Sequence, residues 1–156
     1  SPITTSLRFG RMAFEVMDRR LVARNEWKNT TNTFQGFRGI FGKNTDAFQL
    51  DIFALKPITR LMDEIDKPDN SQNFYGSVLN IRKWNNIATL QPFYLGLENK
   101  QQNMQINSSG LRTYGLIDKT AIDYDTIFVY QFGKHETKTI NAVGYVTEIG
   151  YTFQNI

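Results

Sequence analysis

Three carboxylates, Asp51, Asp125 and Glu148, are the side chains of this sequence best placed for acid–base chemistry. A pair of carboxylates cleaves a glycosidic bond only where the two groups sit ~5–10 Å apart across a bound sugar. Nothing in the sequence sets such a distance, and acids that hold neighbouring arginines in position explain these residues more simply. We therefore expect no catalytic residue and no enzyme activity.

Metal and cofactor chemistry has little support in the sequence. His135 is the only histidine, so neither a catalytic triad nor a histidine cluster can be built on it. The acids Asp63, Glu64, Asp66 and Asp69 are close in sequence, but their spacing departs from that of an EF-hand loop. The chain has no cysteine and hence no thiolate ligand. We expect no metal and no cofactor, and a solvated acidic loop at 63–69.

The elements that position Arg38 and Asp51 are two strands within Thr33–Leu55, joined by a tight turn at 42–45. Apolar and polar residues alternate along both strands, which is typical of a sheet with two differently solvated faces. After the turn, one face would carry Phe48, Leu50 and Ile52, and the other Gln49, Asp51 and Phe53. Each strand spans ~10 residues, which exceeds the usual ~5–6. It matches the ~9–11 that a tilted strand needs to cross a bilayer.

The same alternation predicts about eight strands in the whole chain. The other strands are expected at 4–14, 73–83, 87–97, 110–119, 122–132 and 139–153. Pro57 should end the strand that contains Asp51, and residues 58–65 have helical spacing for about two turns. Pro92 removes a ladder donor, so an irregularity is expected in its strand.

The connections between these strands alternate in length. Long links are expected at 15–32, 57–72 and 98–109, and short ones at 43–44, 84–86 and 120–121. Such alternation is typical of an antiparallel up-and-down transmembrane β-barrel, which has short periplasmic turns and long external loops. Aromatic residues near the strand ends would suit interfacial girdles. They are Phe41, Tyr75, Tyr130, Phe132, Tyr151 and Phe153.

Composition leaves a soluble alternative open. The 156 residues have 40% hydrophobic side chains and a net charge of +3, which also suits a soluble β-barrel or β-sandwich ligand-binding module. There is no apolar run of ~18 residues, which excludes a transmembrane helix. There is also no long Lys/Arg block, so nucleic acid is not an expected partner. No signal peptide is present, so an exported protein would require this chain to be a mature form or a fragment.

Several short motifs, taken in order, resemble the alginate-export family of bacterial outer-membrane β-barrels. The N-terminal ones are Leu7-Arg8-Phe9-Gly10-Arg11, Arg20-Leu21-Val22, Arg24 with Trp27 and Asn29-Thr30, and Phe34 with Gly36 and Arg38. The C-terminal ones are Asp123-Tyr124-Asp125, Tyr130-Gln131-Phe132-Gly133, and Glu148 with Gly150-Tyr151-Thr152-Phe153. Barrels of this family have many more than eight strands. Residues 1–156 are therefore expected to form a single β-barrel domain or an internal portion of a larger one.

The resemblance implies a porin or exporter in the bacterial outer membrane that provides a passive, arginine-lined channel. The solute would be an anionic polysaccharide or a small anionic solute, with the lipid bilayer and periplasmic export proteins as further partners. Guanidinium groups suit carboxylates because their forked donors bind in pairs and keep their charge. The substrate-binding candidates are Arg8, Arg11, Arg24, Arg38, Arg82, Asp51, Asp125 and Glu148.

Overall fold

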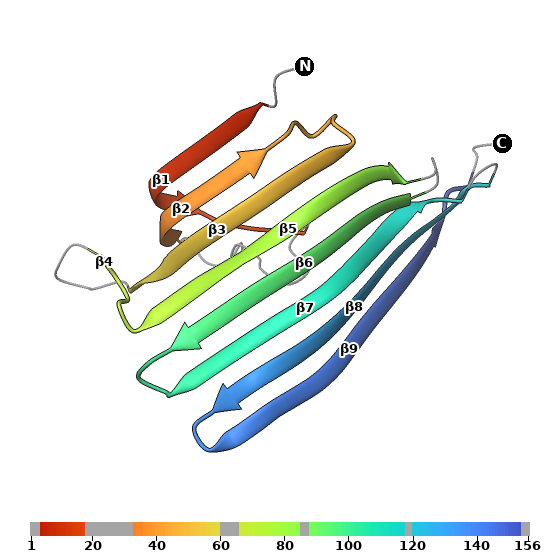
Figure 1. Cartoon of the computed structure of the whole chain (residues 1–156). Helices are drawn as coiled ribbons and strands as arrows, with labels where there is room; N and C mark the ends of the chain where they lie inside the picture. Colours follow the sequence, from red (N-terminus) through yellow and green to blue (C-terminus); the bar gives the residue numbers. More distant parts are fainter. Residues whose placement is uncertain (1–3, 18–32, 60–65, 85–87, 118–119, 154–156) are drawn as a thin grey trace.

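The computed structural model describes residues 4–17, 33–59, 66–84, 88–117 and 120–153, which form strands, turns and irregular segments but no helix. The strands are β1 (Thr5–Ala13), β2 (Thr33–Phe41), β3 (Phe48–Thr59), β4 (Lys67–Pro68), β5 (Gln72–Trp84), β6 (Ala88–Asn99), β7 (Met104–Leu116), β8 (Ile122–His135) and β9 (Lys138–Tyr151). They form one twisted antiparallel sheet in the order β1-β2-β3-β5-β6-β7-β8-β9, with β4 paired to β3 (Figure 1). The up-and-down order confirms the predicted all-β topology.

Two prolines disturb their strands less than predicted. β3 continues through Pro57 to Thr59, where Ile58 pairs with Pro68 of β4. Beyond Leu55 the neighbour of β3 is the segment of β4, where the Asp69 backbone N–H donates to the Pro57 carbonyl oxygen, so the pairing continues although proline offers no donor. Pro92 does not interrupt β6 and is in register with Leu111 of β7. On its other side Pro92 has no partner in the β5–β6 register, which passes from Phe93 to Leu90 and then shifts between Ile81 and Trp84.

The link predicted at 98–109 is also shorter than expected. β6 ends at Asn99 and β7 begins at Met104, so this link spans only 100–103. At the same rim, β8 and β9 are joined through residues 136–137. The alternation of long and short links therefore holds for the first half of the sheet and not for the second. The predicted helix at 58–65 overlaps β3 at Ile58 and Thr59, and its remaining residues, 60–65, lie outside the described ranges.

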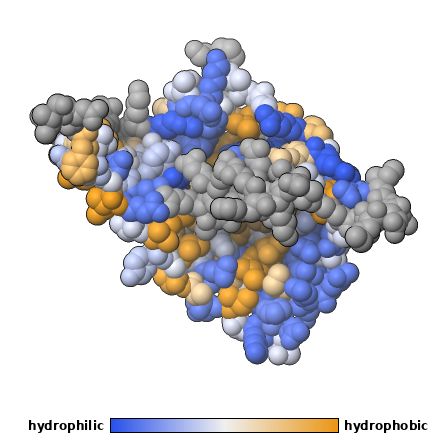
Figure 2. All heavy atoms as spheres, turned by 180° about the vertical axis from the view of Figure 1, so that it is seen from behind, coloured by the Kyte–Doolittle hydropathy of each residue, from blue (hydrophilic) through white to orange (hydrophobic). Residues whose placement is uncertain are grey.

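The cross-strand register divides the side chains between two faces. We call the face that carries Arg38, Asp51 and Val78 the covered face, because residues 14–17 fold over it after β1. In Figure 1 this segment passes behind the ribbons of β2 and β3. From behind, the surface shows hydrophilic residues beside hydrophobic ones (Figure 2). The other side of the sheet is called the exposed face.

An apolar cluster occupies part of the covered face. Phe14 is fully buried, and its ring centroid lies 4.5 Å from that of Phe53 and 6.0 Å from those of Phe34 and Phe74. Phe93, Leu95, Val78 and Ile127 are buried in the same cluster. Several phenylalanines share the face of Arg38, which is in register with Phe53. They pack beneath residues 14–17, which supply the other half of this small core.

The exposed face carries most of the large apolar side chains that contact neither the core nor another layer. Phe9 is 73% exposed, Tyr145 79% and Ile149 76%. By register, the same face holds Leu7, Phe48, Leu50, Tyr94, Leu111, Phe128, Tyr130, Phe132, Val143 and Tyr151, all exposed. A contiguous apolar surface of this kind marks contact with lipid or another apolar partner. No helix in the described ranges has the length and apolar character needed to cross a membrane.

A row of polar residues ends this apolar surface at one rim of the sheet. In the register Arg11 pairs with Gln35, Gln35 with Lys56, Asn73 with Glu98, Glu98 with Gln105, and Gln105 with Lys134. We call these residues the rim row. The height of the apolar surface follows from β8, on which Phe132 beside the rim row and Ile122 at the other end are ten residues apart. At a rise of ~3.4 Å per residue and a strand tilt near 45°, the apolar band is roughly 25 Å tall. That height matches the apolar band of outer-membrane barrels.

Candidate functional site

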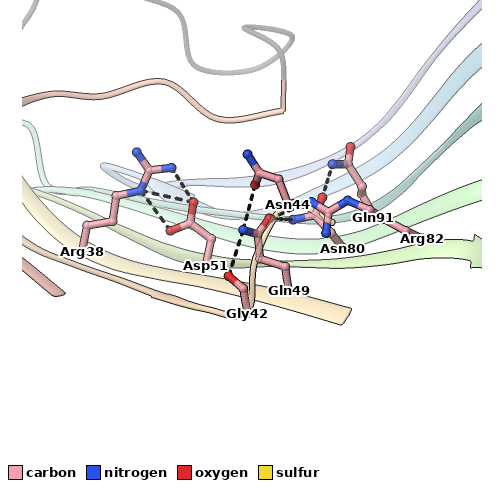
Figure 3. Close-up of polar contacts among 8 residues, drawn as sticks. All are labelled: Arg38, Gly42, Asn44, Gln49, Asp51, Asn80, Arg82 and Gln91. Carbon is pink, nitrogen blue, oxygen red and sulfur yellow. Dashed lines mark hydrogen bonds and ion pairs between the residues drawn. The ribbon is translucent and has the colours of Figure 1, made fainter. Parts of the chain in front are cut away.

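A chain of hydrogen-bonded side chains crosses four neighbouring strands of the covered face. Gln49 of β3, Asn80 of β5, Gln91 of β6 and Arg112 of β7 are all buried. Arg112 Nη1 donates to Gln91 Oε1 at 3.1 Å. Gln91 Nε2 donates to Asn80 Oδ1, and Asn80 Nδ2 donates to Gln49 Oε1 at 3.5 Å (Figure 3). We call these four residues, three amide side chains and the guanidinium of Arg112, the amide row. Each amide is fixed in orientation because its neighbour uses one of its two ends.

Arg38 and Asp51 form a charge pair beside the amide row. Arg38 Nη2 lies 2.6 Å from Asp51 Oδ2, and Arg38 Nε lies 3.1 Å from Oδ1. Their side chains are 17% and 9% exposed. The guanidinium also lies over the Phe14 ring, 5.0 Å from its centroid. Arg38 therefore joins the apolar cluster to the polar part of the face.

A second charge pair stands at the other end of the amide row. Arg112 Nε and Nη2 donate to Asp125 Oδ1 and Oδ2 at 2.9 and 2.6 Å, a forked pairing. The guanidinium also lies 4.5 Å from the centroid of the Tyr114 ring. Two of the predicted acids, Asp51 and Asp125, thus hold arginines in place.

Arg82 fastens the amide row to the turn between β2 and β3. Its Nη2 donates to Gln49 Oε1 at 2.7 Å (Figure 3). Its Nη1 donates to the carbonyl oxygens of Lys43 and Asp46, both at 3.2 Å. Gln49 Nε2 in turn donates to Asn44 Oδ1 at 2.9 Å. These three acceptors of Arg82, two backbone carbonyl oxygens and one amide oxygen, are neutral dipoles.

A cavity of about 1030 Å³ opens above these groups. Its wall includes Arg8, Arg38, Asp51 and Arg82 together with the amides, and Glu15, Val16 and Met17 border it from residues 14–17. Arg8 lies directly opposite Arg38 in the β1–β2 register and is exposed. Because Asp51 compensates Arg38, Arg8 is the more available cation for an anionic solute.

The remaining predicted residues lie elsewhere. Arg11 is on the exposed face, where its Nη2 donates to the carbonyl oxygen of Asp66 at 2.7 Å, so it does not line the cavity. Arg24 falls outside the described residues. Glu148 pairs with Asp125 in the register and borders a smaller cavity of about 430 Å³ with Tyr114 and Asp123. The structure thus gathers Arg8, Arg38, Arg82 and Asp51 on one cavity wall, and places Asp125 and Glu148 at the C-terminal end of the sheet.

Sequence reasoning missed all four residues of the amide row, Arg112 included. The alternation around Arg112 was a usable signal, because Gly110, Arg112 and Tyr114 share one face of a predicted strand. The glutamine and asparagine side chains gave no such signal, since their hydrogen bonds depend on the register of four strands. In the described residues, no group of three or more His, Cys, Asp or Glu side chains could hold a metal ion.

The arrangement suits weak, repeated contact with a polar solute. Amides offer donors and acceptors to hydroxyl groups, and guanidinium groups offer forked donors to carboxylates. A buried polar face and an exposed apolar face on one up-and-down sheet are the organisation of strands in outer-membrane barrels. The fold and the site thus define the class of protein: its sheet is an antiparallel one of the kind found in membrane β-barrels.

A comparison with protein families identifies the particular family. The model of the family described as alginate export matches residues 1–156, the whole chain, so the chain belongs to the alginate-export family. This is a family of outer-membrane β-barrels with a role in transport. No curated protein and no solved structure matches the chain.

Proposed function

We propose that this chain forms part of the wall of an outer-membrane channel through which an anionic polysaccharide or a related anionic solute passes without a chemical reaction. The observation that carries this proposal is the contrast between the two faces of one sheet. One face exposes side chains such as Phe9 and Tyr145. The other buries amides and guanidinium groups around a large polar cavity.

Conduction in such a channel follows from several weak contacts rather than one tight site. The solute carboxylates would meet Arg8 first, since the guanidinium of Arg38 already binds Asp51. The sugar hydroxyls would exchange hydrogen bonds with Gln49, Asn80 and Gln91 as the polymer advances. Solute-facing residues would thus come from β1, β3, β5 and β6, while periplasmic export proteins would act from outside this wall.

Planar lipid bilayers test the channel itself. The protein, inserted into a bilayer, should conduct ions, and anionic uronate oligosaccharides should block the current more strongly than neutral oligosaccharides of the same length. The guanidinium groups favour the uronate oligosaccharides because they form charge-assisted hydrogen bonds with carboxylates. A protein that inserts but conducts nothing, or that both oligosaccharides block equally, would contradict the proposal.

Removing the cation of Arg8 should weaken this block. For Arg8→Gln we expect a three- to tenfold (about 0.7–1.4 kcal/mol) rise in the half-blocking concentration of the uronate oligosaccharide, because a charge-assisted contact in water-filled surroundings is lost. Arg11→Gln is the matched control, since Arg11 lies three residues away on the same strand but on the other face. The half-blocking concentration of this control should stay within about twofold of the wild-type value. If the two substitutions changed the half-blocking concentration equally, Arg8 would not be a solute-binding residue of the proposed wall.

A further inference from the structure

A third cavity, of about 590 Å³, lies on the exposed side of the sheet, at the rim row. We call it the rim groove. Its lining includes Gln35, Lys56, Asn73 and Glu98 of the rim row and Tyr75 of the neighbouring apolar band. The rim groove therefore sits where polar side chains give way to apolar ones, which in a membrane is the depth of the lipid headgroups.

One cation, Lys56, lines this groove, and a second, Arg11, lies next to the lining residue Gln35 in the rim row. Arg11 and Lys56 flank Gln35 in the rim row, two strand spacings or roughly 10 Å apart at the backbone. Both donate to neutral oxygens: Lys56 Nζ to Asn70 Oδ1 at 2.9 Å and Arg11 Nη2 to the carbonyl oxygen of Asp66 at 2.7 Å. Each keeps further N–H donors for a ligand, since an ammonium has three and a guanidinium five. A phosphate group between them would meet both charges.

The opposite side of the rim groove offers hydrogen bonds without positive charge. Asn73 Nδ2 donates to Glu98 Oε2 at 2.9 Å, so the carboxylate is oriented and its other oxygen can accept from a hydroxyl group. Below this pair, the Tyr75 ring covers Gly96, where an added Cβ would lie 2.4 Å from ring atoms. The ring thus forms a flat apolar floor at the top of the lipid-facing band.

The loop that forms the outer wall of the rim groove is held in place. Asp69 accepts hydrogen bonds from the Ser71 backbone and hydroxyl and from Gln72 Nε2, and its own amide donates to the carbonyl oxygen of Pro57. The hydrogen bonds from Ser71 hold the pKa of Asp69 below its ordinary value. The carboxylate therefore stays charged at neutral pH, and Pro68 and Asn70 keep their positions in the wall.

We propose that the rim groove binds the phosphorylated sugar headgroup of a membrane glycolipid. The phosphate contacts Lys56 and Arg11, the sugar hydroxyls contact Asn73 and Glu98, and the acyl chains lie along the apolar exposed face below Tyr75. Lysine and arginine bind phosphate by charge-assisted hydrogen bonds, and their apolar stems let them reach from the apolar band to the headgroups. This inference rests on the proposed membrane location of the sheet, but not on what passes through the channel.

Glycolipid binding can be measured by native mass spectrometry of the detergent-purified protein. The probe is a diphosphorylated, acylated glucosamine disaccharide, compared with the same glycolipid after phosphatase treatment and with phosphatidylglycerol. We expect the diphosphorylated glycolipid to bind best and its affinity to fall roughly tenfold in Lys56→Gln, the loss of about one charge-assisted contact. Lys134→Gln is the matched control, because Lys134 belongs to the same rim row but not to the groove. It should bind within about twofold of wild type.

Three outcomes would overturn the inference: equal affinities for the phosphorylated and dephosphorylated glycolipids, phosphatidylglycerol binding as tightly as the glycolipid, or equal losses in the two lysine variants. The bilayer conductance of Lys56→Gln should match that of wild type, which also shows that the variant folds and inserts. A protein that conducts normally but shows no glycolipid preference would refute this inference alone. A protein that fails to insert at all would refute the proposed function.

Discussion

The Tyr145→Arg substitution should lower the free energy of unfolding in a lipid bilayer by about 2–4 kcal/mol, the cost measured for a cation facing the middle of the bilayer from a barrel strand. Tyr145 lies near the middle of the apolar band on β9 and is 79% exposed. In water, such an exposed side chain could be replaced by arginine at little cost. A large loss of stability in lipid therefore requires that hydrocarbon covers this face.

The neighbouring residue gives the control. Val146 is next in the same strand, on the other face, and is 50% exposed. Val146→Arg should change the free energy of unfolding by less than about 1 kcal/mol, because its side chain meets water and the acids Asp125 and Glu148 lie on the same face. Urea unfolding in lipid vesicles, followed by circular dichroism, measures both. Similar values for the two variants would contradict the membrane assignment.

The alternation of side chains predicted most of the sheet because it acts on each strand separately. The pair around the turn at 42–45 and the strands β8 and β9 have clear period-two patterns, and the structure places them within a few residues of the predicted bounds. The first half of β7 lacks this signal. Gln105, Asn107, Ser108 and Ser109 have low strand propensity, so the sequence predicted a loop there. In the sheet, β6 and β8 pair with β7 on both sides and override that preference.

The candidate site was predictable only where one strand decides which way a side chain points. The alternation put Arg38 and Asp51 on the same kind of face, and the structure joins them. Their contact is diagonal, since the register pairs Arg38 with Phe53 and Ile40 with Asp51. The amide row needs the registers of four strands at once, which no local pattern supplies. Residues 14–17 could not be foreseen either, because their burial depends on the long-range packing of Phe14 against Phe53 and Phe74.

The pair of Arg38 and Asp51 links the stability of the sheet to the charge of the cavity. The Asp51 side chain is 9% exposed, and its carboxylate accepts both guanidinium donors of the pair. Removing one partner of a buried charge pair costs more than the pair itself contributes, because the other charge remains desolvated. Arg38, in contrast, reaches the cavity and retains some solvent contact. The loss of stability found when one partner of a fully buried pair is removed is thus an upper limit for the loss expected at Arg38 and Asp51.

For Asp51→Asn we therefore expect a loss of about 2–4 kcal/mol in the free energy of unfolding, below the 3–5 kcal/mol typical of fully buried pairs. The double variant Arg38→Gln/Asp51→Asn should recover part of this loss, because it leaves no isolated charge.

The same substitution, Asp51→Asn, should also make the protein bind anionic oligosaccharides more tightly, since the Arg38 guanidinium is released toward the cavity. Asp46→Asn, in the exposed turn, is the control and should alter the oligosaccharide block little. Urea unfolding in vesicles and current block in bilayers measure the two effects. Asp51→Asn with lower stability and an unchanged block would show that Arg38 serves the fold alone, whereas a weaker block would contradict the proposed attraction of anions to this wall.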